Sequence, residues 1–388
     1  MHVVIVGGGF GGVKAALELS KRKVGKITLI SKEPYFLHHA TVYATATGQS
    51  SEESVIPLHA LFADHPSVTL VNDTITHIDA DRSRISSATR EYHYDKLILS
   101  LGSVTSFSGV KGAEKYSHSL KTLSAIEAFQ DHIHEEVVRK ELDSEYVVIG
   151  GGQTGVEFAG ALDVYIKNLK TLYRLKKSKA HVTIVEQEPR LLPKLSHTAS
   201  YKVTRQLKKQ GVRVITGQRV ENISKTAVTI GENLHPDATV IWTSGSEPNP
   251  FYKQNTPTFH LDDQGHVFVN PYLEAFDDVY VIGDSNSVIN NDTAWSAVAQ
   301  AKAVARSITR EAQALPKKKF HQGRYIQSSP VGYKWAYVEY FGIYVAGVSG
   351  WVVRRWIELY SYCQIMPLKK ALPIWRAHDL SEIDTSLD

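Results

Sequence analysis

The chain has 388 residues, which suits two or three domains better than a single core. Its residues are 43% hydrophobic and 22% charged, as in folded globular proteins, which excludes a disordered or low-complexity chain. The net charge of +4 is too small to indicate a nucleic-acid partner, and a single cysteine, Cys363, excludes an internal disulfide, a dithiol redox pair and a cysteine-rich metal site.

The chain opens with a predicted strand at 3–6, and no pattern of a signal peptide comes before it. A glycine cluster, Gly7-Gly8-Gly9-Phe10-Gly11-Gly12, follows directly and leads into a predicted helix. In this context the spacing G-x-G-x-x-G is typical of a dinucleotide site. Gly7 permits a tight turn, Gly9 lets a pyrophosphate approach the backbone, and Gly12 lets helix and strand pack closely. One such match is weak alone, because glycine turns are common.

The next strand, at 26–31, ends in Ser31, where dinucleotide sites usually carry an acidic residue that binds a ribose. Serine can make this hydrogen bond, but more weakly. Glu33 is an alternative, although side-chain alternation along a strand favours Ser31. The strand at 96–100, followed by Gly102, would complete this first unit.

The same order of elements returns in the middle of the chain. A strand at 146–149 leads to Gly150-Gly151-Gly152-Gln153-Thr154-Gly155 and a helix. The strand after it ends in Glu186, whose carboxylate would bind a ribose and repel a 2′-phosphate, which favours NADH over NADPH. A strand at 239–243 leads to Gly245. Two such units predict two dinucleotides placed to meet.

A later strand, at 278–282, ends in Gly283-Asp284 and precedes a predicted helix at 293–311. Asp284 would bring a carboxylate to the first unit, where a flavin ribityl chain would lie. The alternative is that it caps a helix. Residues 312–319 are predicted to form a linker.

The remaining residues, 320–388, are rich in aromatic and basic side chains. On a helical wheel of 352–366, one face is apolar and the opposite face is polar, with Arg355 at a flank. This pattern fits a helix lying on an anionic membrane through residues 350–376, or a helix packed against the protein or a dimer partner. The apolar face comprises Val352, Val353, Trp356, Ile357, Tyr360 and Cys363, and the polar face Arg354, Glu358 and Ser361.

Together these motifs resemble the two-dinucleotide flavoprotein superfamily, and within it the type II NADH dehydrogenases, which are single-subunit NADH:quinone oxidoreductases that pump no protons. The resemblance rests on the two glycine motifs and on the stretches at 43–48, 94–102, 155–160 and 280–284. It covers roughly residues 1–312 and, more loosely, the aromatic and basic tail.

The resemblance implies an α/β fold with two Rossmann-like, glutathione-reductase-like domains and a C-terminal amphipathic membrane-associating region. The FAD-binding domain would be discontinuous, at 1–110 and 275–319. The NADH-binding domain would occupy 111–274 and the membrane-associating region 320–388.

The resemblance also implies residue roles. Glu157 would lie near the flavin and nicotinamide and orient the nicotinamide or relay a proton, unless it is only a solvated carboxylate in the first turn of a helix. FAD would be bound by Gly7, Gly9, Phe10, Gly12, Ser31, Lys32, Thr47, Gly102, Asp284, Ala297 and Val298. NADH would be bound by Gly150, Gly152, Gly155, Glu186 and Gly245.

The chain departs from the family pattern where the quinone should bind. Trp295 and Ala299 occupy positions that are commonly glutamine, with Gln300 one step along. Ala44 likewise stands where a glutamine often occurs. The quinone-site candidates are therefore Ala44, Trp295 and Gln300, and Trp295 could stack on a quinone or simply belong to the core.

We expect an enzyme that passes electrons from NADH through FAD to a membrane quinone, as a peripheral, monotopic protein on the cytoplasmic face of the cell membrane. No apolar run approaches the ~20 residues needed to span a bilayer. A homodimer is possible, and no metal is expected. The alternatives are a soluble NADH oxidase or reductase with another acceptor, and a redox-sensing protein similar to apoptosis-inducing-factor and ferroptosis-suppressor flavoproteins.

Overall fold

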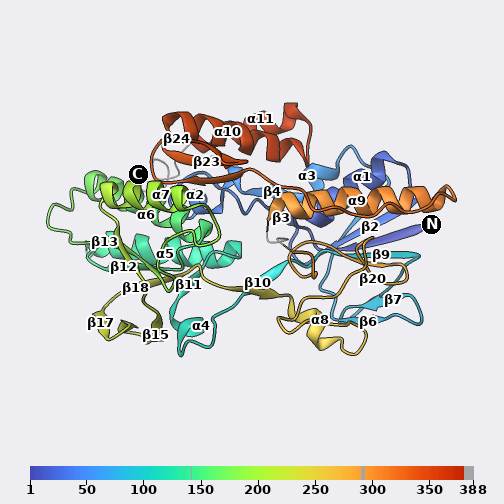
Figure 1. Cartoon of the computed structure of the whole chain (residues 1–388), viewed down its shortest axis with the longest axis horizontal. Helices are drawn as coiled ribbons and strands as arrows, with labels where there is room; N and C mark the ends of the chain where they lie inside the picture. The colour runs from blue at the N-terminus through green and yellow to red at the C-terminus, as the bar shows by residue number, and fades with distance from the viewer. Residues whose placement is uncertain (141, 290–292, 380–388) are drawn as a thin grey trace.

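The structure, a computed structural model, describes residues 1–140, 142–289 and 293–379. Two β-sheets lie side by side along the long axis of the molecule, and a C-terminal layer extends across both of them (Figure 1). Residues 380–388 of the predicted membrane-associating region lie outside the described residues.

The first sheet combines strands from the beginning of the chain with strands that come after residue 270. All neighbours pair in parallel except β20, which pairs with β21 in the antiparallel sense. In spatial order the strands are β20 (Glu274–Phe276), β21 (Val279–Val281), β9 (Lys96–Leu99), β1 (His2–Val6), β2 (Lys26–Ser31) and β5 (Val68–Asn72).

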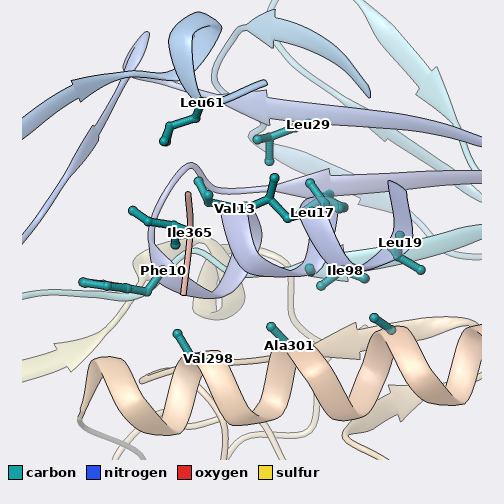
Figure 2. Close-up of a cluster of buried hydrophobic side chains, with 14 of the residues drawn as sticks. Phe10, Val13, Leu17, Leu19, Leu29, Leu61, Ile98, Val298, Ala301 and Ile365 are labelled. Atoms are coloured by element: carbon teal, nitrogen blue, oxygen red, sulfur yellow. The ribbon is translucent and has the colours of Figure 1, made fainter. Parts of the chain in front are cut away.

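Helices α1 (Phe10–Lys21) and α9 (Ala294–Ala312) lie next to each other on one face of this sheet. Their small and branched side chains, such as Val13 of α1 and Ala301 of α9, are buried in one hydrophobic core with side chains of the sheet (Figure 2). The opposite face is covered by the small sheet of β6 (His77–Asp79), β7 (Arg84–Ser86) and β8 (Glu91–His93) and by α8 (Pro250–Gln254). Apolar burial on both faces is what makes the strands of this sheet almost continuously hydrophobic.

The second sheet repeats this architecture and is entirely parallel. Helices cover one face and a three-stranded antiparallel sheet covers the other. The sheet strands are β11 (His118–Ser119), β18 (Thr239–Trp242), β12 (Glu145–Ile149), β13 (His181–Glu186) and β14 (Arg213–Thr216). The covering elements are α5 (Leu123–Arg139), α6 (Gln153–Leu172), α7 (His197–Gln210), β15 (Val220–Ile223), β16 (Ala227–Ile230) and β17 (Asn233–Pro236).

Short elements complete the first half of the chain and connect the two sheets. The strands β10 and β19 pair in the connection between the sheets. The bounds are β3 (Tyr35–Leu37), α2 (Val42–Thr45), η1 (Ser51–Glu53), β4 (Val55–Pro57), α3 (Leu58–Phe62), β10 (Ser103–Thr105), α4 (Ala113–Tyr116) and β19 (Ser246–Pro248).

The C-terminal layer packs on both halves of the molecule. Tyr362 and Ile365 belong to the core on the face of the first sheet that α1 and α9 cover. Val331 and Tyr337 belong to the core on the helical face of the second sheet. The layer therefore bridges the two halves, as Figure 1 shows in red. It consists of β22 (Gln327–Pro330), β23 (Ala336–Tyr340), β24 (Ile343–Gly347), α10 (Val348–Cys363), α11 (Leu368–Arg376) and η2 (Ala377–Asp379).

Helix α10 turns its polar face inward, which the hydrophobic pattern alone did not indicate. Arg354 and Glu358 are only 8% and 2% exposed, whereas Trp356 and Tyr360 are 63% and 58% exposed. A surface helix of a globular protein normally does the reverse. Within the described residues, no helix is both long and apolar enough to cross a membrane.

Candidate functional site

A cavity of about 610 Å³ lies between the two sheets, at the carboxyl ends of their strands. Loops that follow β1, β2 and β9 line one end, and the first turns of α6 together with the segment after β18 line the other. Ligands of open parallel sheets bind at this edge, where the strand order reverses. The lining residues include Gly7, Gly9, Phe10, Ser31, Lys32, Gly102, Glu157, Gly245, Asp284 and Ala297 from the predicted set.

The first glycine motif has the geometry of a phosphate cradle. Gly7 has φ +113°, and a Cβ there would meet the Ser100 carbonyl oxygen at 2.1 Å. A Cβ on Gly12 would lie 1.9 Å from the Gly7 carbonyl oxygen, so this glycine permits helix and strand to pack closely. A Cβ on Gly9 would meet nothing within 4 Å, because its backbone faces open space. The amino end of α1, which has no acidic residue in its first turn, is thus open to an anion.

The second motif repeats these features. Gly150 has φ +110°, and a Cβ on Gly155 would lie 1.8 Å from the Gly150 carbonyl oxygen. Gly152, like Gly9, faces open space. Corresponding hydrogen bonds fix both loops, from Gly7 N to Ile30 O and from Gly150 N to Val185 O, each 2.8 Å long.

Ser31 and Glu186 occupy corresponding positions beside the two loops. A Cβ on Gly8 would lie 2.4 Å from Ser31 Oγ, and one on Gly151 would lie 2.9 Å from Glu186 Oε2. Glu186 accepts hydrogen bonds from the backbone N–H groups of Gly151 (2.6 Å) and Glu188 (2.9 Å). The structure therefore places Ser31, as expected from alternation, at the position equivalent to Glu186.

Asp284 lies past the end of β21, half-buried in the cavity wall. Its Oδ2 accepts a hydrogen bond from the Ser103 hydroxyl (2.9 Å), and Ser103 Oγ in turn accepts one from Lys121 Nζ (2.8 Å). This chain of polar groups was not found from the sequence, since Ser103 and Lys121 lie in short connecting segments without a motif.

Glu157 projects into the cavity from the first turns of α6. It is buried, and no hydrogen-bond or ion-pair partner is found for it among the described residues. Burial raises the pKa of the Glu157 carboxyl to about 8, although the cation of Arg354 acts in the opposite direction. A carboxyl of this kind is protonated near neutral pH and can donate a proton. It is therefore no ordinary solvated first-turn carboxylate.

A family model described as pyridine nucleotide-disulphide oxidoreductase matches residues 1–304. The chain belongs to this family. A type II NADH:quinone oxidoreductase of Staphylococcus saprophyticus is 24% identical over 303 residues, covering 74% of this chain and 75% of the relative. The type II NADH:quinone oxidoreductase Ndh of Mycobacterium tuberculosis is 27% identical over 339 residues, covering 80% and 72%.

Solved structures show the same fold. NDH2 from Plasmodium falciparum in complex with NADH superimposes with a TM-score of 0.87 at 15% identity, covering 99% of this chain and 98% of the other. The sulfide:quinone oxidoreductase of Aquifex aeolicus gives a TM-score of 0.76 at 20% identity, covering 95% and 92%. These similarities confirm the predicted resemblance to type II NADH dehydrogenases and the prediction of FAD and NADH as the two nucleotides.

The residues present fit an FAD in the first unit of this pyridine nucleotide-disulphide oxidoreductase. The open cradle at Gly9, the hydroxyl of Ser31 and the carboxylate of Asp284 face one continuous cavity. Disulfide chemistry does not fit, because Cys363 is the single cysteine and lies on α10, outside the cavity lining.

A second, smaller hollow of about 40 Å³ adjoins the main cavity, and Phe10 and Ala294 line both. Trp295 and Val298 also line this hollow, beneath α10. The indole of Trp295 stacks on the ring of Tyr360, with centroids 5.5 Å apart and planes 23° apart. The hollow has room for about one water molecule but not for a quinone ring.

Several predicted residues lie outside both hollows. Gln300 is fully buried, and its Oε1 accepts hydrogen bonds from Gly283 N and Asn286 Nδ2, both 2.8 Å long. Thr47 donates to backbone carbonyls of α2, at Tyr43 and Ala44. The predicted residues that line neither hollow are Gly12, Ala44, Thr47, Gly150, Gly152, Gly155, Glu186 and Gln300.

A buried charge network on the polar face of α10 joins this helix to the first half of the chain. Glu358 accepts hydrogen bonds from Arg354 Nε (2.8 Å) and Arg355 Nη1 (2.5 Å). Arg354 also donates to Ser328 Oγ and to the Ala40 carbonyl oxygen. Arg354 and Glu358 line the smaller hollow, so the polar face of α10 forms part of its wall.

The same network includes His378, near the end of the described residues. His378 Nδ1 lies 2.9 Å from Glu53 Oε2, and Arg355 Nη1 lies 3.4 Å from Glu53 Oε1. Burial opposes protonation of His378, but its hydrogen bond to Glu53 outweighs this and raises the pKa of the imidazole. The pairing of opposite charges explains how two arginines can be buried in one helix.

Proposed function

We propose that this protein is a peripheral membrane NADH:quinone oxidoreductase that uses FAD. The observation that carries the proposal is the single cavity that joins the two nucleotide-binding units. Ser31 and Lys32 lie at its first end and Ser244 and Gly245 at its second, with Glu157 in the wall between them. Two nucleotides bound at these ends would bring their redox-active rings together.

The chain's own residues would mainly bind and orient. The amino ends of α1 and α6 would hold the two pyrophosphates, and Ser31 and Glu186 the two adenosine riboses. Lys32, Gly102 and Asp284 would complete the FAD site. When bound, FAD supplies the hydride and electron chemistry that no side chain of the cavity can provide.

We assign to Glu157 the handling of protons beside the two rings. Reduction of a quinone consumes protons, and the carboxyl of Glu157 holds one near neutral pH because burial raises its pKa. Its place on a helix, rather than on a loop, fixes it at the junction of the two sites.

The acceptor would enter through the smaller hollow. Phe10 and Ala294 form the boundary that it shares with the nucleotide cavity. A quinone ring would need the stacked pair of Trp295 and Tyr360 to separate. Tyr360 is exposed at the surface of α10, so the pair is free to open outward. Gln300 would hold the loop at Gly283 in place rather than bind the quinone.

The exposed apolar face of α10 supports attachment to a membrane. It continues onto β24 and the turn before it, where Phe341 and Ile343 are also exposed. Lys369 and Arg376 of the neighbouring α11 are exposed at its margin. Aromatic anchors with basic margins are typical of surfaces that bind anionic lipid. A lipid-soluble acceptor would reach the Trp295–Tyr360 pair directly from such a surface.

Steady-state turnover tests the proposed activity. NADH oxidation by the purified holoprotein, with a short-chain quinone in the absence of oxygen, should depend on the quinone concentration. NADPH should be a poorer donor, because Glu186 would repel its 2′-phosphate. NADH oxidation that requires oxygen and does not respond to quinone would contradict the proposed acceptor and favour the soluble-oxidase alternative.

A further inference from the structure

Lys121 lies where the two halves of the cavity meet. The chain leaves the first half through β10 and enters the second through β11. Lys121 lies between β11 and α5, directly before Thr122, which is the N-cap of α5. The segment 120–123 lines the cavity. The ammonium group of Lys121 donates a hydrogen bond to Ser103 Oγ, on the connecting strand β10.

This ammonium has no direct counter-charge in the described part of the chain. No carboxylate there lies within 4.0 Å of Lys121 Nζ, and Asp284 is reached only through the Ser103 hydroxyl. Burial lowers the pKa of Lys121, and Asp284 acts in the opposite direction. An incompletely paired cation in a sheltered site is costly, so a ligand that gains negative charge there would benefit from it.

The orientation of the FAD site indicates which part of a bound ligand would lie beside the Lys121 ammonium. The cradle at Gly9 and the hydroxyl of Ser31 would hold the adenosine and pyrophosphate half. The isoalloxazine would then extend to the part of the cavity between the two units, which Glu157 and Lys121 line. Isoalloxazine gains negative charge on reduction, and a fixed positive charge beside it tunes its potential.

We infer that Lys121, positioned by Ser103, raises the reduction potential of the bound flavin by placing an unpaired positive charge beside its ring. This inference rests on the assignment of the FAD site and is independent of the acceptor. It makes Lys121 an electrostatic determinant of how readily NADH reduces the enzyme.

The test is the midpoint potential of the bound flavin, measured against a reference dye without NADH or quinone. Lys121→Met, which keeps the length of the side chain, should lower the ratio of reduced to oxidised flavin at least tenfold at a fixed potential, or about 30 mV for a two-electron couple. Lys121→Arg, which keeps the charge, should stay within about threefold of the parent, as should Lys115→Met, which removes an exposed lysine outside the cavity.

A second pair of variants retains the lysine. Ser103→Asp places a carboxylate beside the ammonium and should lower the potential in the same direction, whereas the neutral Ser103→Asn should not. An unchanged potential in Lys121→Met, or equal potentials in Ser103→Asp and Ser103→Asn, would overturn the inference. Weaker NADH binding without a change in flavin potential would overturn it too, because Lys121 would then serve the second nucleotide. If the protein failed to reduce quinone, the proposed acceptor would be wrong, but these potentials would still test the inference because they are measured without quinone.

Discussion

At the scale of single residues, Glu157 is the side chain whose chemistry depends most on the fold. Its carboxyl has an ordinary pKa of 4.5 and a pKa of about 8 in the folded protein, because burial disfavours its charge. At a pH between about 4.5 and about 8, the Glu157 carboxyl holds a proton in the folded state and has released it in the unfolded state. Glu157 therefore favours folding fully below about pH 4.5, and this contribution is lost as the pH rises to about 8.

Replacing Glu157 by glutamine removes this dependence, since the amide does not titrate. Relative to the parent, the free energy of unfolding of Glu157→Gln should rise by more than about 1 kcal/mol between about pH 5 and pH 8. Urea unfolding at both pH values, with excess FAD, measures it. Glu188→Gln, at an exposed position, should show no such trend. A parallel pH dependence of parent and Glu157→Gln would mean that Glu157 is ionised in the folded protein.

The sequence predicted the residues of the glycine loops because their roles are local. Gly7, Gly12 and Ser31 act through the backbone or through their place at a strand end, which spacing reveals. Lys121 and Ser103 could not be found in this way. They meet only because the fold brings the segment between β11 and α5 next to β10.

At the scale of elements, α10 shows that the periodicity of a sequence does not determine how a helix is oriented in the fold. A helical wheel separates an apolar from a polar face but does not say which face is buried. Here three-way pairing of Arg354, Arg355 and Glu358 compensates the burial of charge, and this pairing depends on side-chain geometry. The helix position and its two faces were predictable from the sequence, and its orientation was not.

Because the polar face of α10 is the buried one, a change on that face should lower the free energy of unfolding more than a change on the apolar face. Glu358→Gln should lower the free energy of unfolding by about 3 to 5 kcal/mol, because two buried guanidinium groups lose their shared partner. Trp356→Ser, on the exposed face of the same helix, should change it by less than about 1 kcal/mol. Denaturant unfolding of both variants provides the measurement. A larger loss in Trp356→Ser than in Glu358→Gln would indicate that the apolar face is the packed one.

At the scale of the whole molecule, the C-terminal layer presents its apolar side to the outside while bridging both halves. A triple change of Phe341, Trp356 and Tyr360 to serine should strongly reduce flotation with anionic liposomes. Changing the exposed Val138, Leu172 and Leu234 to serine instead provides a matched control, because these residues lie on the second half of the molecule. Loss of self-association with unchanged flotation would show that the surface joins two copies of the chain.

The central claim is that two nucleotides share one cavity and pass electrons through FAD to a quinone. Anaerobic stopped-flow absorbance of the flavin tests it most directly. NADH should bleach the flavin absorbance of the holoprotein within its turnover time, and a short-chain quinone added next should restore the absorbance at a rate that rises with quinone concentration. A flavin that stays oxidised with NADH, or that stays reduced when quinone is added, would contradict the account.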